Sequence, residues 1–262
     1  MRIAIFSDVH ANAIALDAVL EDIHAGGGVD AYWMIGDVTD MGSDPARCIS
    51  RLQALPALSI VHGNGDRAVV RSDADALAMR LADISAEDVR VELMYLEEAA
   101  WARGAITAAG QFDWLASLPL EVRTTLPDGT RVLLVHASPG TDEETGLRVE
   151  YSDDEIRTLL GSPDADLVIV GHTHMPLDWR VDDIRVFNSG SVSNPVTRDQ
   201  RAMWSLLEAD ESGYRLDRRF VEYDREAYLR QVTLVHHPAE AAIGAFFDQA
   251  VGGRYVHLNI PP

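Results

Sequence analysis

The stretch Arg2-Ile3-Ala4-Ile5-Phe6-Ser7-Asp8-Val9-His10 opens the chain with an apolar run that ends directly in polar residues. The run predicts a buried strand over residues 2–7, and the apolar spacing of residues 12–25 predicts a helix that the glycines at 26–28 end. Strand patterns at 31–35 and 58–62, separated by a helical pattern at 45–54, continue the alternation. Strands that alternate with helices indicate βαβ units and a parallel sheet.

Residues 67–118 interrupt this alternation with a polar, helix-rich segment, clearest at 89–101 and 108–118. We interpret it as a helical insertion in a single domain that spans residues 1–262. The rest of the chain is β-rich and ends in two predicted helices. The expected strands are 121–126, 131–135, 167–170, 177–181, 185–188, 202–208 and 214–221, and the expected helices are 225–232 and 239–250.

Composition restricts the partners that the protein can have. The 262 residues carry a formal net charge of −20, and all basic residues are Arg, so we expect no binding to long nucleic acids. No apolar stretch reaches the ~20 residues of a membrane span, and Cys48 is a single cysteine that cannot form an internal disulfide. We therefore expect a cytoplasmic protein without membrane contact, and its oligomeric state stays open.

Polar residues of only three types follow the predicted strands. They are Asp8, His10, Asp37, Asn64, Asp66, His136, His172 and His174. In a parallel sheet such positions meet at the carboxyl edge, where ligands bind. Carboxylate and imidazole groups suit manganese, iron or zinc, and the absence of cysteine ligands argues against a structural zinc site. Two adjacent ions of this kind can activate water for attack on a phosphoryl group.

Five ordered motifs resemble those of the calcineurin-like metallophosphoesterase superfamily. They are Ser7-Asp8-Val9-His10, Gly36-Asp37, Gly63-Asn64-Gly65-Asp66, Val135-His136-Ala137-Ser138-Pro139 and Gly171-His172-Thr173-His174. The resemblance extends to about Asn194, and it is strongest to the bacterial branch of phosphodiesterases and diadenosine polyphosphate hydrolases. It implies an α/β fold, α+β in part, built as a four-layer αββα sandwich.

The resemblance also implies a ligand set for two divalent ions, with manganese as the first choice and iron or zinc as alternatives. Asp8, His10 and His174 would hold one ion, Asn64, His136 and His172 would hold the other, and Asp37 would bridge them. The implied reaction is hydrolysis of a phosphodiester or nucleoside polyphosphate through a metal-bridging hydroxide. The expected partner is a small phosphoester or nucleotide.

One position departs from the family pattern, because Gly65 stands where most members have a histidine that assists the leaving group. Loss of such general-acid help, worth ~10²–10⁴-fold, harms least a substrate whose leaving group is already a good anion. Asp66 is our candidate for a catalytic role; it could equally cap the following helix or orient a ligand. Asn12 and Arg103 are candidate substrate contacts, and Asp40 is interpreted as a solvated loop carboxylate.

Two other functions stay open on the same residues. A phosphomonoesterase or protein phosphatase would use the same ions. A metal-binding regulatory protein with impaired catalysis would account for Gly65, although every expected ligand is present. The sequence does not identify the physiological substrate, the metal, or the group that replaces the motif histidine.

Overall fold

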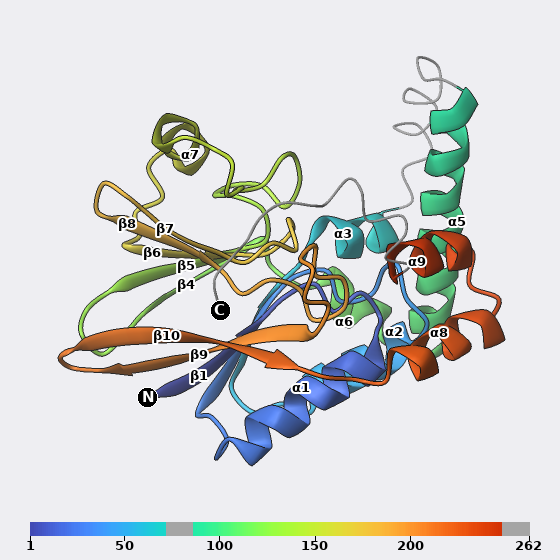
Figure 1. The fold of residues 1–262 in the computed structure, drawn as a ribbon, viewed down its shortest axis with the longest axis horizontal. Helices are drawn as coiled ribbons and strands as arrows, with labels where there is room; N and C mark the ends of the chain where they lie inside the picture. Colours follow the sequence, from blue (N-terminus) through green and yellow to red (C-terminus); the bar gives the residue numbers. More distant parts are fainter. Residues whose placement is uncertain (72–85, 248–262) are drawn as a thin grey trace.

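Two five-stranded sheets pack face to face in the computed structural model, which describes residues 1–71 and 86–247 (Figure 1). The first sheet has the order β10-β9-β1-β2-β3, and the second has the order β4-β5-β6-β8-β7. The strands of the first sheet are β1 (Arg2–Phe6), β2 (Ala31–Ile35), β3 (Leu58–Val61), β9 (Ala202–Asp210) and β10 (Gly213–Val221). Those of the second are β4 (Glu121–Thr125), β5 (Arg131–Val135), β6 (Leu167–Val170), β7 (Leu177–Val181) and β8 (Ile184–Asn188).

Parallel pairing forms the centre of each sheet. β1 pairs in parallel with β2, and β2 with β3, while β6 lies parallel to both β5 and β8. Antiparallel strands complete the edges: β9 and β10 form a hairpin beside β1, β7 and β8 form another hairpin, and β4 pairs with β5. The predicted parallel α/β half is therefore confirmed, within sheets that are mixed overall.

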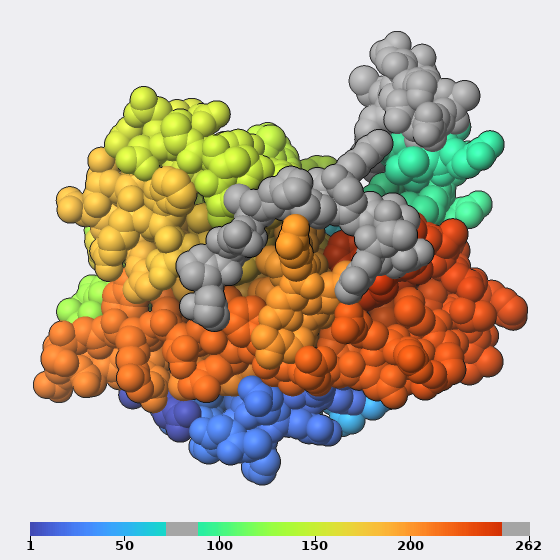
Figure 2. Space-filling model, viewed as in Figure 1, coloured from blue at the N-terminus to red at the C-terminus, as the bar shows by residue number. Residues whose placement is uncertain are grey.

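Helices cover the outer face of both sheets, so the expected four-layer sandwich is confirmed. The first sheet carries α1 (Ala13–Ala25), α2 (Pro45–Gln53), α3 (Asn64–Val70), α5 (Ala86–Ala108) and α6 (Phe112–Ala116). The second sheet carries α7 (Asp153–Leu160). The final helices, α8 (Arg225–Leu234) and α9 (Glu240–Phe247), pack beside α1 and α5. In Figure 2, α7 with its preceding loop and α5 rise on opposite sides above the body of the molecule.

Alternation along β1 explains why the layers stack. Ile3 and Ile5 point into the core between the sheets, where they pack with Leu134 of β5, whereas Ala4 and Phe6 point toward the helices. Because successive side chains of a strand point to opposite faces, an uninterrupted apolar run is what a strand buried on both faces requires. The run at the start of the chain thus fixes β1 in the centre of the sandwich.

The helices differ from the prediction in two respects. The expected helix at 108–118 is wrong in its bounds: α5 continues to Ala108, Gly110 turns the chain with a φ of 70°, and only the short α6 follows. α7 was not predicted, although Ser152 and Glu155 form a capping box at its start. The end of the expected helix at 239–250 lies outside the described residues. The insertion at 67–118 stays a prediction, since 72–85 also lie outside them.

None of the helices within the described ranges is long and apolar enough to cross a membrane.

Candidate metal centre

The loops that follow five strands bring the predicted ligands to one place. The seven residues are Asp8 and His10 after β1, Asp37 after β2, Asn64 after β3, His136 after β5, and His172 and His174 after β6. Asn64 is also the first residue of α3, so the helix holds it in place. The sandwich therefore joins the carboxyl ends of strands from both sheets, as the parallel pairing led us to expect.

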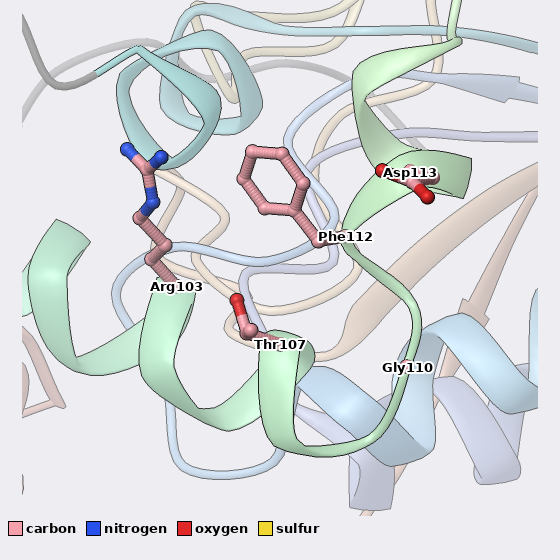
Figure 3. Close-up of a pocket in the computed structure, with 5 residues that line it drawn as sticks. All are labelled: Arg103, Thr107, Gly110, Phe112 and Asp113. Carbon is pink, nitrogen blue, oxygen red and sulfur yellow. The ribbon is translucent and has the colours of Figure 1, made fainter.

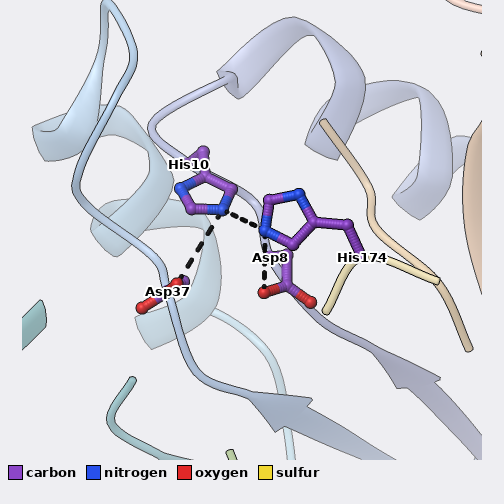
Figure 4. A group of neighbouring side chains, drawn as sticks. All are labelled: Asp8, His10, Asp37 and His174. Carbon is purple, nitrogen blue, oxygen red and sulfur yellow. Dashed lines mark hydrogen bonds and ion pairs between the residues drawn. The ribbon is translucent and has the colours of Figure 1, made fainter. Parts of the chain in front are cut away.

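A first group consists of Asp8, His10, Asp37 and His174, whose ligand atoms lie within 4.8 Å of one another (Figure 4). The Nε2 atoms of His10 and His174 are 3.0 Å apart. His174 Nε2 lies 3.4 Å from Asp8 Oδ1, and His10 Nε2 lies 3.8 Å from Asp37 Oδ2. Two imidazole nitrogens that face each other at this distance need a cation between them, either a proton or a metal ion.

A second group shares Asp37 with the first. His136 Nε2 is 3.2 Å from Asp37 Oδ2, and the rings of His136 and His172 lie 5.2 Å apart. His172 Nδ1 is 2.8 Å from the side-chain amide of Asn64. Asp37 therefore lies between the two sets of ligands, at the position expected of a bridging carboxylate.

All four imidazoles have one ring nitrogen held by an oxygen and the other directed at the cluster. The holding contacts are His10 Nδ1 to Asp40 Oδ1 at 2.9 Å, His136 Nδ1 to the Ile35 carbonyl at 2.6 Å, His174 Nδ1 to the Asn194 carbonyl at 2.8 Å, and His172 Nε2 to the Glu144 carbonyl at 2.9 Å. An oxygen that accepts from one ring nitrogen leaves the lone pair of the other nitrogen for a metal. This is the usual arrangement around histidine ligands.

Backbone strain is concentrated at the same residues. Asp8, His10, Asp37, His172 and His174 all have φ between 45° and 65°, in the left-handed region that costs a non-glycine residue about 1 kcal/mol or more. Strain of this kind persists where the surrounding structure over-determines it, most often at functional sites. Five of the seven predicted ligands are therefore held at a conformational cost.

The donor set fits divalent cations on two further counts. Asp8 is completely buried, and its Oδ2 has no hydrogen-bond partner in residues 1–71 and 86–247. A buried carboxylate oxygen without a partner is rare and needs an explanation, which a cation would supply. The mixture of carboxylate, amide and imidazole donors also suits a transition metal.

The shifted pKa values of the cluster also indicate that it binds positive charge. Burial disfavours a charged His10, but the carboxylates of Asp40, Asp37 and Asp8 outweigh burial and raise the pKa of His10 to about 10. For His136 too, Asp37 and Asp8 outweigh burial and raise its pKa to about 10. Burial opposes ionisation of Asp37, yet His136 and His10 hold its pKa well below the usual range. Without a metal, imidazolium groups balance the carboxylates.

Asp66, our candidate for a catalytic role, supports the loops instead of facing the cluster. Its Oδ1 accepts hydrogen bonds from the amides of Val38 and Thr39 and from the Thr39 hydroxyl, and its Oδ2 accepts from the Gly63 amide. Asp66 is completely buried. Its carboxylate therefore links the start of α3 to the loop after Asp37, which agrees with the alternative roles of capping and ligand orientation.

The structure does not bring Asn12 or Arg103 to open space beside the cluster. Asn12 is buried, caps α1 by accepting from the Ala15 amide, and donates to Ser193 Oγ. Arg103 donates to the Val70 carbonyl and lies over the ring of Phe112. It lines a separate hollow of about 380 Å³ with Thr107, Gly110 and Asp113 (Figure 3).

Asp40 is the functional residue that the sequence interpretation missed. It is 9% exposed and holds His10, so its interpretation as a solvated loop carboxylate is wrong. The next residue, Met41, is held from two sides: Glu98 of α5 accepts from its amide at 2.6 Å, and the Tyr228 hydroxyl of α8 donates to its carbonyl at 3.4 Å. The spacing of Asp37 and Asp40 could have indicated that Asp40 has a role in the cluster. The contacts of Met41 with Glu98 and Tyr228 join residues far apart in the chain, and no sequence pattern indicates them.

A pocket of about 530 Å³ opens beside the cluster, between α3, α5 and the loop after β5. Asn64, Gly65 and Asp40 line its inner side, and Tyr95 and Leu96 of α5 line its outer side. It contains two cationic residues. Arg67 is paired with Asp142 and Glu143, whereas Arg71 has no ion-pair partner among the described residues. Space for a small anionic molecule thus adjoins the candidate metal ligands.

A two-sheet sandwich with Asp and His residues at its joined strand ends is the architecture of the metallophosphoesterase fold. The chain belongs to the calcineurin-like phosphoesterase superfamily, whose domain profile matches residues 1–212. This family is metal-dependent, and its membership supports a hydrolase.

Individual relatives agree with the family. An uncharacterized protein of Methanocaldococcus jannaschii is 28% identical over 243 residues, which cover 86% of this chain and 90% of that protein. A metallophosphoesterase of Sphaerobacter thermophilus superposes with a TM-score of 0.72 at 26% identity, over 96% of this chain and 99% of that one. A hypothetical protein of Pyrococcus horikoshii OT3 shares the fold, with a TM-score of 0.77 at 18% identity over 94% and 97% of the two chains.

Proposed function

We propose that this protein is a dinuclear metal-dependent phosphoesterase that hydrolyses small phosphodiesters or nucleoside polyphosphates. The observation that carries the proposal is the orientation of the four imidazoles. Each is held by an oxygen on one side; on the other side, those of His10, His136 and His174 face the carboxylates of Asp8 and Asp37, and that of His172 faces the amide of Asn64. A structural histidine needs one satisfied nitrogen; four that all present the second nitrogen to one place indicate a ligand shell.

The geometry supports the assignment of ligands to two ions that the family resemblance implies. Asp8, His10 and His174 would hold one ion, and Asn64, His136 and His172 the other, with Asp37 between them. When bound, the ions supply an activated water nucleophile and withdraw charge from the phosphoryl oxygens. The chain itself fixes the ligands through Asp40 and backbone carbonyls, and no protein nucleophile is required. Manganese is our first choice of metal, with iron or zinc as alternatives.

The pocket supports a substrate with more than one anionic group or with an organic group beyond the reacting phosphate. Arg71 has no ion-pair partner among residues 1–71 and 86–247, and the pocket also contains Glu92, Glu98 and Glu143. Because the net charge of the chain is −20, we expect a local cation to attract the substrate where the overall field repels it. Gly65 offers no side chain to protonate a leaving group, so good leaving groups such as nucleotides or activated phenols are favoured.

The decisive experiment measures hydrolysis by metal-stripped protein reloaded with manganese. The substrates are bis-p-nitrophenyl phosphate, p-nitrophenyl phosphate and diadenosine tetraphosphate, and Asp37→Asn is the control. We expect hydrolysis of the diester or the dinucleotide to return with metal and to be absent in the control. Faster hydrolysis of the monoester would favour a phosphomonoesterase. Bound manganese with no turnover of any substrate would favour a metal-binding regulatory protein.

A further inference from the structure

The presence of glycine at position 65 is explained by the space around it, and not only by the loss of a catalytic side chain. A Cβ atom built on Gly65 would lie under 3.0 Å from the carboxyl carbon and from both oxygens of Asp40. Contacts that short are essentially never found for a real Cβ, so no side chain fits at position 65 while Asp40 stays in place. The carboxylate of Asp40 occupies the volume in which any side chain of residue 65 would begin.

Backbone conformation does not explain the glycine. Gly65 is the second residue of α3, and its φ is outside the left-handed region that favours glycine. Glycine in a helix costs about 1 kcal/mol relative to alanine. The space taken by Asp40 is therefore what accounts for glycine at this position.

Asp40 is held in this position from both sides. Its Oδ1 lies 2.9 Å from His10 Nδ1, and its neighbour Met41, with a φ of 55°, is fixed by Glu98 and Tyr228. Asp40 also lines the pocket together with Gly65 and Asn64. The loop after β2 thus directs one carboxylate at the ring of His10 and packs it against the backbone of α3.

We propose that Asp40 and Gly65 form a coupled pair, in which Asp40 fills the place of a residue-65 side chain and acts as the positioning residue for His10. In this protein the carboxylate of Asp40 occupies the space that a side chain at position 65 would take. Asp40 orients the imidazole so that Nε2 is presented to the metal centre, and Gly65 provides the room that this orientation needs. The metal-binding part of the inference rests on the proposed function, because it takes His10 as a ligand.

The coupling is tested first on stability, in metal-free protein. Gly65→Ala should lower the melting temperature, since the new methyl group collides with Asp40. The double variant Gly65→Ala/Asp40→Ala should melt above the Gly65→Ala protein, because removal of the carboxylate makes room. Gly104→Ala is the matched control: Gly104 lies inside α5, has no positive φ, and would meet no described heavy atom within 4 Å. It should not lower the melting temperature.

Metal affinity then tests the positioning role, by calorimetric titration of the metal-free proteins with manganese. Loss of a group that orients a histidine ligand reduces affinity by ~10–100-fold. We expect this loss in Asp40→Ala and in the double variant, and a smaller loss in Asp40→Asn, whose amide oxygen can still accept from His10 Nδ1. The double variant should therefore recover stability without recovering affinity, which separates positioning from folding.

Two results would overturn the inference: Gly65→Ala with wild-type stability, or Asp40→Ala with wild-type manganese affinity. If wild-type protein binds none of manganese, iron and zinc, the proposed function fails, but the double-variant comparison in metal-free protein still decides whether Asp40 and Gly65 are coupled. Rescue in that comparison would uphold the pairing even then.

Discussion

Glu98 should make the metal-free protein less stable as the pH rises, because its carboxyl group is buried among other acids. Its exposed fraction is 2%, and it accepts a hydrogen bond from the Met41 amide. Burial, followed by the charge of Asp40, raises the pKa of Glu98 from 4.5 to about 8. A carboxyl group whose pKa is higher in the folded chain than in the unfolded chain binds its proton more tightly when folded. Its contribution to stability is complete below pH 4.5 and is lost as the pH rises toward 8.

The pKa shift of Glu98 determines how much stability the folded protein loses at high pH. At pH 7.5 the unfolded carboxyl is three pH units above its pKa of 4.5, whereas the folded one is still mostly protonated. At about 1.36 kcal/mol per unit, the cost at this pH is at most about 4 kcal/mol. In Glu98→Gln the amide oxygen still accepts from Met41, but the amide nitrogen is buried, which costs about 1–3 kcal/mol if it finds no partner. The net gain in stability at pH 7.5 is therefore about 1–3 kcal/mol.

Urea unfolding at pH 4.5 and pH 7.5, with a chelator present, measures this gain. We expect Glu98→Gln to be more stable than wild type at pH 7.5 and to lose that advantage at pH 4.5. The control is Glu97→Gln, because Glu97 is the exposed neighbour on the same helix. An equal stability difference between Glu98→Gln and wild type at both pH values would refute the reasoning, since it would mean that the carboxyl group titrates normally.

Three further predictions concern the pocket, the metal and the C-terminal helices. Arg71→Ala should raise the KM for diadenosine tetraphosphate about tenfold with little change in kcat, while Arg51→Ala, which removes an arginine paired with Asp17, should change neither in the same steady-state assay. Manganese should raise the melting temperature of metal-free wild type in a calorimetric scan, and it should raise that of Asp37→Asn much less. His237 is 3% exposed, and burial lowers its pKa to about 4. The free energy of unfolding, measured with urea, should therefore fall by about 1–2 kcal/mol as the pH drops from 7 to 5, and His237→Asn should lack this pH dependence.

The residue pattern was sufficient for the parallel strands and for bringing the predicted ligands together, whereas the two-sheet sandwich was implied only by the family resemblance. A short apolar run such as residues 3–6 favours a strand buried on both faces, and the helices between β1, β2 and β3 favour their parallel pairing. Because parallel strands place their carboxyl ends on one edge, the polar residues after each strand had to converge there. That inference needed only the residue type and its position relative to the strand, so it survived small errors in element bounds.

Side-chain direction was not predictable in the same way. Asp40 looks like a loop acid, and its inward position depends on a glycine in α3 and on Glu98 of α5. Arg103 can extend several ångströms in any direction from its helix, and it packs on Phe112 instead of reaching the pocket. Such outcomes depend on contacts between residues far apart in the sequence, and no local pattern records them.

We propose that catalysis, and not only metal binding, has shaped the cluster, because the cluster is costly to fold and borders an open pocket. Five of the predicted ligands lie in left-handed conformations at about 1–3 kcal/mol each, and a carboxylate oxygen of Asp8 is buried with them without a hydrogen-bond partner among the described residues. A bound cation would compensate for the buried charge in either case. A structural or regulatory site would, however, be closed around its ions, as structural metal sites generally are. Here Asn64 borders an open pocket lined by Arg71, which has no ion-pair partner in the described part of the chain, and such access is needed only if a substrate reaches the proposed metal ions.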